Sequence, residues 1–242
     1  MIARQSKSLA APALERGLSL LEFLTAQSKP LTLTQVAQGL GLTVSEIQRP
    51  VACLLERGYL RRTAAGAYVL SGMLYRLANL HPPHLHLQRS ALPLMLDFAR
   101  HTSQSVHLCV PDGEAALLLS DVPGGGLVRI TLQAGARLDS NTTVSGRILQ
   151  AFGCLSHDNQ ADYKKRILQS KASNLIRKRN YEKANSSYAI GIMDMGVPVR
   201  NHDGRVIAAL TASLLLLKKT KVVAGSLLKD LHQCALGITQ AL

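Results

Sequence analysis

The segment between Thr32 and Leu70 constrains the fold more than any other part of the chain. Apolar residues at helical spacing lead into a glycine turn that ends at Gly41, and a second amphipathic stretch then runs to Gly58. A short hairpin with two adjacent arginines follows. This order is typical of a winged helix-turn-helix, in which the second helix enters the DNA major groove. We therefore predict a DNA-binding domain over 1–72.

The second helix of this motif has a clear start signal and an interruption. Thr43 and Glu46 have the spacing of a capping box, in which the threonine hydroxyl and the glutamate carboxylate satisfy backbone amides reciprocally. Counted from this cap, Pro50 lies inside the helix, where a proline removes a hydrogen bond and costs about 3 kcal/mol. The helix therefore either bends at Pro50 or begins later than the capping box indicates.

Five polar residues of the motif are candidates for DNA contacts. Gln48 and Arg49 lie in the first two turns of the second helix, and side chains of these types form paired hydrogen bonds with adenine and guanine. Arg49 has an alternative role, in which it folds back onto Glu46 or Glu56 and orients the helix. The arginines of the hairpin are expected to contact phosphates, which position the protein without specifying sequence. The expected DNA-binding residues are Ser45, Gln48, Arg49, Arg61 and Arg62.

The chain is strongly basic, with 28 Lys and Arg against 15 Asp and Glu and a formal net charge of +13. This balance favours polyanionic partners, and double-stranded DNA is the obvious one. Much of the excess outside the predicted DNA-binding domain lies in 161–185. We interpret that stretch as a solvated helix-loop surface, with a second phosphate-contacting face as the alternative.

Helices on either side of the motif complete the N-terminal half. A first helix is predicted over Leu14–Gln27. Its core-facing residues are expected to be Leu14, Leu18, Leu21 and Leu24. A linker helix and hinge are predicted over 73–86, because an apolar stretch over Met73–Leu80 is followed by a His-Pro-Pro-His sequence that no helix can continue through easily.

The remainder, 87–242, alternates helices with antiparallel strands, which indicates an α+β domain. Helices are expected at Gln88–Arg100, Ser145–Leu155 and Val222–Leu242. Strands are expected at Ser105–Val110, Ala115–Asp121, Val128–Gln133, Gly196–Val199 and Val206–Leu214.

Composition and motifs exclude several function classes. The four cysteines are far apart with apolar neighbours, so we expect reduced core thiols in a cytoplasmic protein. No signal peptide or membrane-spanning run is visible, so no membrane partner is expected. His81, His84 and His86 cluster around two prolines, but a metal site needs further ligands and a rigid frame. An exposed linker is favoured there, and neither a metal nor a cofactor is expected.

The residues above, taken in order, resemble the IclR family of bacterial transcription regulators over about 14–240. In the N-terminal part, the residues in family register are Leu14-Glu-Arg-Gly-Leu18, Val36-Ala37, Gly41-Leu42, Ser45, Arg49 and Leu54-Leu-Glu-Arg-Gly-Tyr59. In the C-terminal part, Asn141–Leu149 is similar to a loop-helix entry that often reads His-x-Thr-Ala-x-Gly-Lys. Gly191–Val199 and Gly204–Ser213 are similar to the paired strands that form one wall of the family's effector pocket.

The resemblance implies a winged helix-turn-helix followed by a GAF-like α/β effector-binding and oligomerisation domain. It also implies a small carboxylic or aromatic acid as effector, a homodimer or tetramer, and a near-palindromic operator. Amide groups at the start of the helix near Ser145 can bind an anion, and Thr211 and Ser213 point the same way on one strand. Carried over by position, the effector-binding residues are Ser145, Gly146, Ile192, Asp194, Thr211 and Ser213.

Three positions depart from the family pattern. Asn141 replaces the usual histidine, and Arg147 replaces the usual lysine. Asp194 lies where many members carry an apolar residue or cysteine. A carboxylate repels an anionic effector unless it is protonated or accepts a hydroxyl hydrogen bond. A neutral, hydroxylated or cationic ligand, or a vestigial pocket, therefore remains open.

The favoured interpretation is a ligand-responsive, sequence-specific DNA-binding transcription regulator that controls a catabolic operon. Nothing in the C-terminal part assembles a nucleophile, a base and an orienting group, so an enzyme that merely includes a winged helix is disfavoured. A second alternative is an architectural or non-specific nucleic-acid-binding protein. That alternative predicts steep salt dependence and little discrimination between sequences.

Overall fold

The computed structural model describes residues 11–80, 84–126, 128–155, 169–216 and 224–242. The chain divides into two compact units, Met1–Pro83 and His84–Leu242. Each unit has its own apolar core. We describe the two units separately, as the winged-helix unit and the effector unit.

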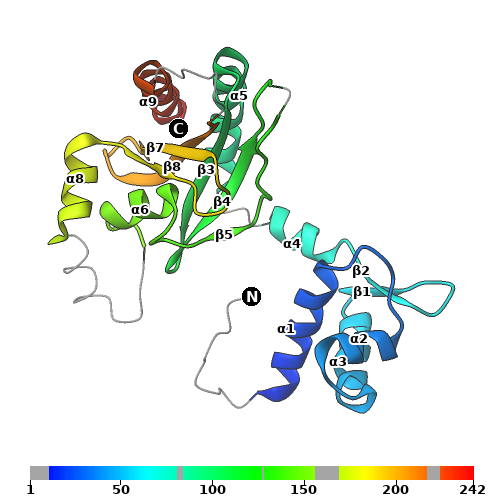
Figure 1. Ribbon diagram of the computed structural model, residues 1–242. Coiled ribbons are helices and arrows are strands. Elements are labelled where there is room, and N and C mark those ends of the chain that lie inside the picture. Colours follow the sequence, from blue (N-terminus) through cyan, green and yellow to red (C-terminus); the bar gives the residue numbers. More distant parts are fainter. Residues whose placement is uncertain (1–10, 81–83, 127, 156–168, 217–223) are drawn as a thin grey trace. The chain divides into compact units, whose positions relative to one another are not determined.

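The winged-helix unit packs three helices beside a two-stranded hairpin, and a fourth helix follows (Figure 1). Its elements are α1 (Pro12–Thr25), α2 (Leu33–Leu40), α3 (Val44–Glu56), β1 (Leu60–Arg62), β2 (Tyr68–Leu70) and α4 (Met73–Leu80). The hairpin is antiparallel, and Leu60 pairs with Leu70. The core centres on Leu20, Ile47 and Val51, which are 3% exposed or less. The predicted winged helix-turn-helix is confirmed.

Two of the leucines expected in the core of this unit are exposed. Leu14 is 63% exposed and Leu18 is 51% exposed, whereas Leu20 and Leu24 are buried. Only the C-terminal half of α1 meets the core, so its buried face passes through Leu20 instead of following the predicted stripe to the helix start. The prediction was therefore wrong for Leu14 and Leu18.

The turn between α2 and α3 follows local rules closely. Gly41 has φ of 69°, a left-handed conformation that suits glycine at the end of a helix. The backbone amide and the hydroxyl of Thr43 both donate to Oε2 of Glu46, at 2.9 and 2.8 Å. α3 begins at Val44 and runs through Pro50 to its end. The alternative of a later helix start is therefore wrong.

The effector unit is a six-stranded antiparallel sheet in the order β5-β4-β3-β8-β7-β6, with helices on both faces (Figure 1). Its strands are β3 (Ser105–Asp112), β4 (Ala115–Val122), β5 (Arg137–Leu138), β6 (Glu182–Asn185), β7 (Ile192–Arg200) and β8 (Val206–Leu215). Its helices are α5 (Leu85–Thr102), α6 (Val144–Ala151), α8 (Lys171–Arg179) and α9 (Ala224–Gln240).

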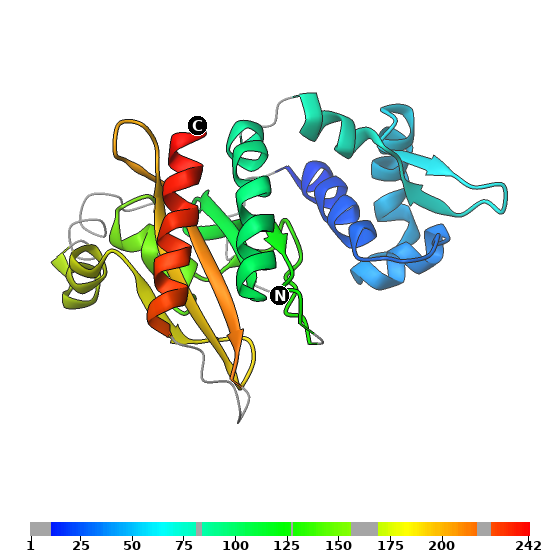
Figure 2. The ribbon, with the colours of Figure 1, turned by 90° about the horizontal axis from the view of Figure 1, so that it is seen from above.

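Each face of this sheet has its own apolar core. α5 and α9 lie side by side on one face (Figure 2), where Met95 and Leu231 are fully buried. α6 and α8 cover the other face, where Ile148 and Leu149 are fully buried. The second face also contains the polar residues described below, so the functional side of the sheet is the side under α6.

One predicted strand is absent from the effector unit. Residues 128–133 alternate apolar and polar side chains, but they form no strand in the part that the structure describes. The backbone amide of Leu132 donates to Oδ2 of Asp121 at 3.2 Å, and Ile130 and Leu132 line a cavity. Thr131 lines the same cavity, so the apolar side chains of Ile130 and Leu132 face a cavity and not a neighbouring strand. The edge strand beside β4 is β5, which begins four residues after Gln133.

The cysteines are partly as expected. All four thiols are free, and Cys109 and Cys234 are buried. Burial raises the pKa of each of these two thiols to about 12, which keeps them protonated and unreactive. Cys154 is partly buried, but Cys53 is exposed on α3. The expectation of a core thiol was wrong for Cys53, because it lies on the outer face of that helix.

Candidate DNA-reading face and effector cavity

The outer face of α3 carries the three predicted base-contacting residues. Ser45, Gln48 and Arg49 are exposed, while Ile47 and Val51 of the same helix are buried. A period of 3.6 residues places the exposed three on one side of the helix. The structure thus brings these side chains together on a surface free of core contacts.

The carboxylate of Glu46 is occupied by partners outside this face. Its Oε1 accepts a hydrogen bond from Nη2 of Arg16 at 3.1 Å, and its Oε2 accepts from Thr43. The hydrogen bond from the Thr43 amide is the main cause that lowers the pKa of Glu46. Among the described residues, Arg49 forms no salt bridge, so it folds back onto neither Glu46 nor Glu56.

The two hairpin arginines differ in their surroundings. Arg62 donates from Nε to the Gly66 carbonyl at 3.2 Å, and its guanidinium lies 5.8 Å from the centroid of the Tyr68 ring. Arg61 is exposed and pairs with Val69 across the hairpin, so its side chain leaves on the opposite face. Arg61 is therefore the arginine that is free to extend, whereas Arg62 lies against the hairpin.

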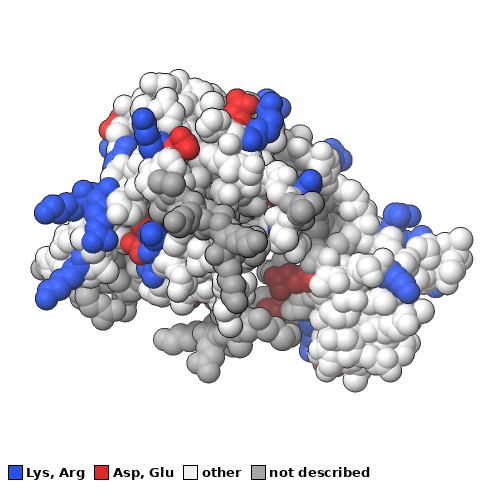
Figure 3. Space-filling view, turned by 45° about the horizontal axis from the view of Figure 1, so that its top comes forward, with Lys and Arg blue, Asp and Glu red and all other residues white. Residues whose placement is uncertain are grey.

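Basic side chains also gather on the effector unit, over the region of α8 at the left of Figure 3. The last turn of α8 contains Arg177, Lys178 and Arg179. Arg177 donates to the Ala151 carbonyl at 2.6 Å and so ties α8 to α6. The other basic residues of the predicted 161–185 surface up to position 168 lie outside the described residues.

A cavity of about 180 Å³ lies between the sheet and the start of α6 in the effector unit. One wall comes from β3, β7 and β8, and a second comes from the first turn of α6. The rest of the lining comes from Leu138 of β5, from Thr143 just before α6 and from the segments 130–132 and 186–189. Apolar groups such as Ile130, Leu138 and Val144 alternate there with hydroxyl-bearing side chains. The cavity is large enough for a small organic molecule.

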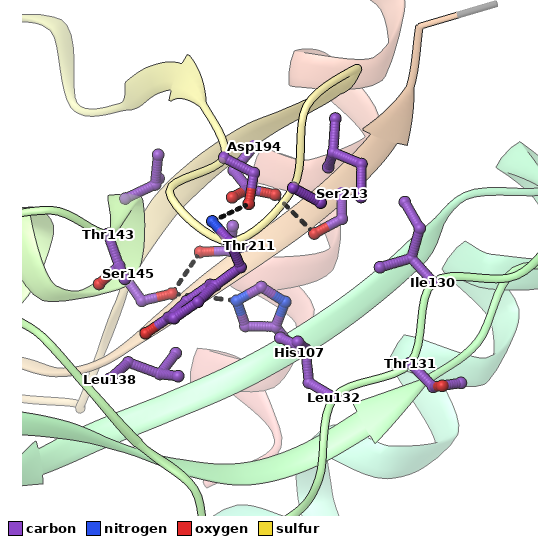
Figure 4. Close-up of a pocket in the computed structure, with 15 residues that line it drawn as sticks. His107, Ile130, Thr131, Leu132, Leu138, Thr143, Ser145, Asp194, Thr211 and Ser213 are labelled. Atoms are coloured by element: carbon purple, nitrogen blue, oxygen red, sulfur yellow. Dashed lines mark hydrogen bonds between the residues drawn. The ribbon is translucent and has the colours of Figure 1, made fainter. Parts of the chain in front are cut away.

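A buried polar chain crosses the wall of this cavity (Figure 4). Nε2 of His107 lies 3.1 Å from Oγ of Ser145, and that oxygen lies 2.8 Å from Oγ1 of Thr211. The hydroxyl of Ser213 donates to Oδ1 of Asp194 at 2.7 Å. All these side chains except Asp194 are at most 6% exposed. Their hydrogen bonds satisfy polar groups that would otherwise be costly to bury.

His107 is the residue of this wall that sequence reasoning missed. It lies on β3 inside an apolar run, and the strand register places it opposite Thr211. Burial lowers the pKa of His107 to about 4, against a smaller raising effect of the Asp194 charge. The imidazole is therefore neutral near pH 7. The only sequence signal was a histidine in an otherwise apolar strand, which does not reveal the face it points to.

Five of the six predicted effector-binding residues line this one cavity: Ser145, Ile192, Asp194, Thr211 and Ser213. Gly146 does not line it. A Cβ atom on Gly146 would lie 2.4 Å from Cα of Ser140, so this glycine lets α6 pack closely against the preceding loop. It positions the start of α6, and a ligand contact at Gly146 stays a prediction.

Gly196 has a comparable positioning role on β7. A Cβ atom there would lie 2.7 Å from Oγ1 of Thr211 and 2.8 Å from side-chain atoms of Ile148 and Val144. The absent side chain therefore allows α6 to lie directly on the sheet. This contact brings Ser145 within hydrogen-bond distance of Thr211.

The described residues contain no group of three or more His, Cys, Asp or Glu side chains that could hold a metal ion. His81 of the histidine cluster lies outside them. No described helix is long and apolar enough to cross a membrane.

A winged helix-turn-helix joined to an α+β domain, with a largely apolar cavity that contains a few polar side chains, defines a class of DNA-binding regulators with an effector-binding domain. Two family models match the chain: the IclR helix-turn-helix domain over residues 13–64, and the bacterial transcriptional regulator IclR C-terminal domain over residues 82–240. The chain belongs to the IclR family of bacterial transcription regulators.

Relatives along the full chain agree with this assignment. The HTH-type transcriptional regulator XynR of Escherichia coli is 24% identical, over 95% of this chain and 96% of the relative. The glycerol operon regulatory protein of Streptomyces coelicolor is 23% identical over the same shares. These relatives are named as regulators, in agreement with the two family models, which show that the chain is a transcription regulator and not an enzyme that merely includes a winged helix.

Solved structures show the same fold. IclR of Thermotoga maritima is 22% identical with a TM-score of 0.73, over 94% of this chain and 97% of that one. An IclR homolog from Microbacterium hydrocarbonoxydans, solved in complex with 4-hydroxybenzoate, is 22% identical with a TM-score of 0.75, over 95% and 98%. The predicted two-part α+β architecture is confirmed.

Proposed function

We propose that this protein is a ligand-responsive, sequence-specific regulator of a catabolic operon, acting on DNA in the cytoplasm. The observation that carries the proposal is the exposed face of α3, where Ser45, Gln48 and Arg49 lie together and free of core contacts. Polar side chains on such a helix can read base edges in the major groove, while Arg61 contacts a phosphate.

The regulator acts as a homodimer or tetramer on a near-palindromic operator. Leu14 and Leu18 support a partner, because two large apolar side chains on one helix are exposed in the single chain. Effector binding changes DNA affinity only if the effector favours one placement of the paired winged helices over the other.

The effector binds in the cavity of the effector unit. Its volume suits a molecule of a few to about ten non-hydrogen atoms, and the family resemblance points to a small carboxylic or aromatic acid. The Microbacterium homolog was solved with 4-hydroxybenzoate, which is an aromatic acid of this size. An uncharged hydroxylated compound of similar size fits the same volume.

Fluorescence anisotropy with two duplexes tests the proposal. One duplex comes from the region upstream of the protein's own gene, and the other is a shuffled copy, both near physiological salt. We expect the upstream duplex to bind at least about 100-fold more tightly. Gln48→Ala should erase the preference, and Arg61→Ala should weaken both duplexes alike.

A matched control variant is Gln27→Ala, which removes an exposed glutamine outside α3. It should leave both affinities unchanged. If both duplexes bind equally and are released together as salt rises, the protein is a non-specific nucleic-acid binder and the proposal fails, unless a systematic search with random duplexes finds a preferred operator.

A further inference from the structure

The charge of the cavity lining sets limits on what can bind there. Asp194 contributes a half-buried carboxylate to the wall. None of the described residues that line the cavity is a lysine or an arginine. The described wall therefore presents one negative charge, no fixed positive charge and several hydroxyl groups.

Two nearby groups that could have supplied a positive charge do not supply one. His107 is buried and neutral near pH 7, and its Nε2 is engaged by Ser145. Arg147, at the position of the family's usual lysine, does not line the cavity and forms an ion pair with Oε1 of Glu182 at 3.3 Å. A ligand carboxylate would meet Asp194 without a compensating cation.

The backbone offers an anion only partial compensation. The first turn of α6 lines the cavity, and a helix N-terminus strengthens anion binding by roughly two- to five-fold at a surface and by up to about 30-fold in a partly buried site. Thr143 already caps this turn by accepting a hydrogen bond from the Gly146 amide at 3.1 Å. Two like charges about 6 Å apart, at an effective dielectric constant of about 20, weaken binding roughly 100-fold. Repulsion from Asp194 therefore outweighs the helix.

We propose, resting on the proposed effector site but in place of the carboxylic acid that the family resemblance implies, that the cavity binds an uncharged hydroxylated organic molecule and that Asp194 excludes carboxylic acids from it. Oδ1 of Asp194 already accepts from Ser213, and Oδ2 accepts no hydrogen bond from a described residue. A ligand hydroxyl donates to Oδ2. Such hydrogen bonds to a charged acceptor are roughly twice as strong as neutral ones.

A cationic ligand fits the wall less well than an uncharged one. A cationic ligand beside the half-buried Asp194 carboxylate would lose its water of hydration. The attraction between the two charges often only balances the free energy of that desolvation. The remaining polar groups are hydroxyls and a neutral imidazole, which hydrogen-bond with an alcohol without any charge being buried. The hydroxyls of Thr211 and Ser213 are already hydrogen-bonded to Ser145 and Asp194, but each oxygen has a further lone pair that can accept a hydrogen bond from a ligand hydroxyl.

Matched probe sets test the proposal by isothermal titration calorimetry on the full-length protein. The first set is 4-hydroxybenzyl alcohol, 4-hydroxybenzoate and 4-hydroxybenzylamine, and the second is glycerol, glycerate and 3-amino-1,2-propanediol. Within a set the members differ mainly in one group, an alcohol, a carboxylate or an amine. Each set is measured with wild-type protein, with Asp194→Asn and with Asp203→Asn.

In at least one set, the alcohol should bind wild-type protein at least 10-fold more tightly than the acid. Asp194→Asn keeps an acceptor for Ser213 but removes the charge, so it should tighten acid binding 10- to 100-fold and reverse or abolish the preference. Asp203→Asn makes the same change of net charge in the exposed turn between β7 and β8, and should behave as wild type.

Three results would overturn the inference. The first is that the acid binds wild-type protein as tightly as the alcohol does. The second is that the amine binds more tightly than the alcohol. The third is that no member of either set binds wild type or Asp194→Asn. Each leaves the anisotropy experiment on operator DNA unaffected. If the anisotropy experiment shows no sequence preference while calorimetry still shows binding of the alcohol, the regulator proposal fails. The proposal that the cavity binds an uncharged hydroxylated molecule then still stands.

Discussion

In the winged-helix unit the side chains proposed to read DNA are exposed, whereas in the effector unit the side chains proposed to bind a ligand are buried. Gln48 and Arg49 face solvent, but Ser145 and Thr211 are each 1% exposed and hydrogen-bonded to each other. Ordinary surface substitutions change stability by about 0.5 kcal/mol or less, whereas stranding a buried polar group costs about 1–3 kcal/mol. DNA preference can therefore change without affecting the fold, but ligand preference largely cannot.

The largest expected effect tests the close contact between α6 and the sheet that forms one wall of the cavity. Gly196→Val places atoms where Thr211, Ile148 and Val144 already lie, so the effector unit should lose about 3 kcal/mol of unfolding free energy. Urea unfolding followed by circular dichroism measures it. Gly225→Ala, where a Cβ atom meets nothing within 4 Å, is the matched control and should not destabilise. An unchanged midpoint for Gly196→Val would show that α6 is not held against the sheet as described.

The second expected effect concerns pH and the effector unit alone. The pKa of His107 is about 4 in the folded protein and about 6.5 when free, so between these values the unfolded chain binds a proton that the folded chain does not. Its contribution to stability is complete above pH 6.5 and falls by roughly 3 kcal/mol as the pH decreases to 4. Unfolding measured from pH 7.5 to 4 should show this slope, and His107→Gln should reduce it. An equal slope in the variant would assign the pH dependence to other groups.

A third experiment compares the two units directly through one substitution in each. Ser145→Ala removes the hydroxyl shared by His107 and Thr211 and should cost about 2 kcal/mol of unfolding free energy. Gln48→Ala should cost less than about 0.5 kcal/mol. Thermal unfolding of both variants, beside the binding assays, gives the contrast. Equal costs would contradict the distinction between the two units.

The smallest expected effect concerns the winged-helix unit, at the cap that starts α3. Thr43→Ala removes the hydroxyl that donates to Glu46 at the start of α3 and should destabilise the winged-helix unit by about 1 kcal/mol. Thr34→Ala, at an exposed position of α2, is the control and should be neutral or slightly stabilising. Urea unfolding distinguishes the two variants. A Thr43→Ala protein as stable as wild type would show that the amide of Thr43 alone holds the cap.

The same contrast explains what the sequence could and could not predict. The cap at Thr43 and the turn at Gly41 depend on neighbouring residues, so local rules were sufficient for them. Strand pairing between His107 and Thr211 joins positions far apart in the chain, and no local pattern encodes it. The candidate residues of the cavity came from resemblance to a family, and the histidine beside them was missed.

Two wrong predictions have the same physical origin. The alternation in 128–133 is that of a half-buried strand, but the buried side of this segment faces a cavity and not a second strand. Leu14 and Leu18 have the spacing of a core-facing stripe, yet the core ends before them. Periodicity shows that one side of a segment is apolar, but it does not identify what that side meets.

Pro50 gives the recognition helix an unusual mechanical property. A proline has no amide hydrogen to donate to the carbonyl four residues earlier, so α3 lacks one backbone hydrogen bond at Pro50. The missing bond lies between the turn that contains Gln48 and the turn that contains Val51. Helices bend most easily at such points. Ile47 holds the first half of α3 in the core as Val51 holds the second, so bending at Pro50 is limited to small adjustments about these two contacts. Operators would then be distinguished by how well they fit this narrow range of bend as well as by the bonds they offer.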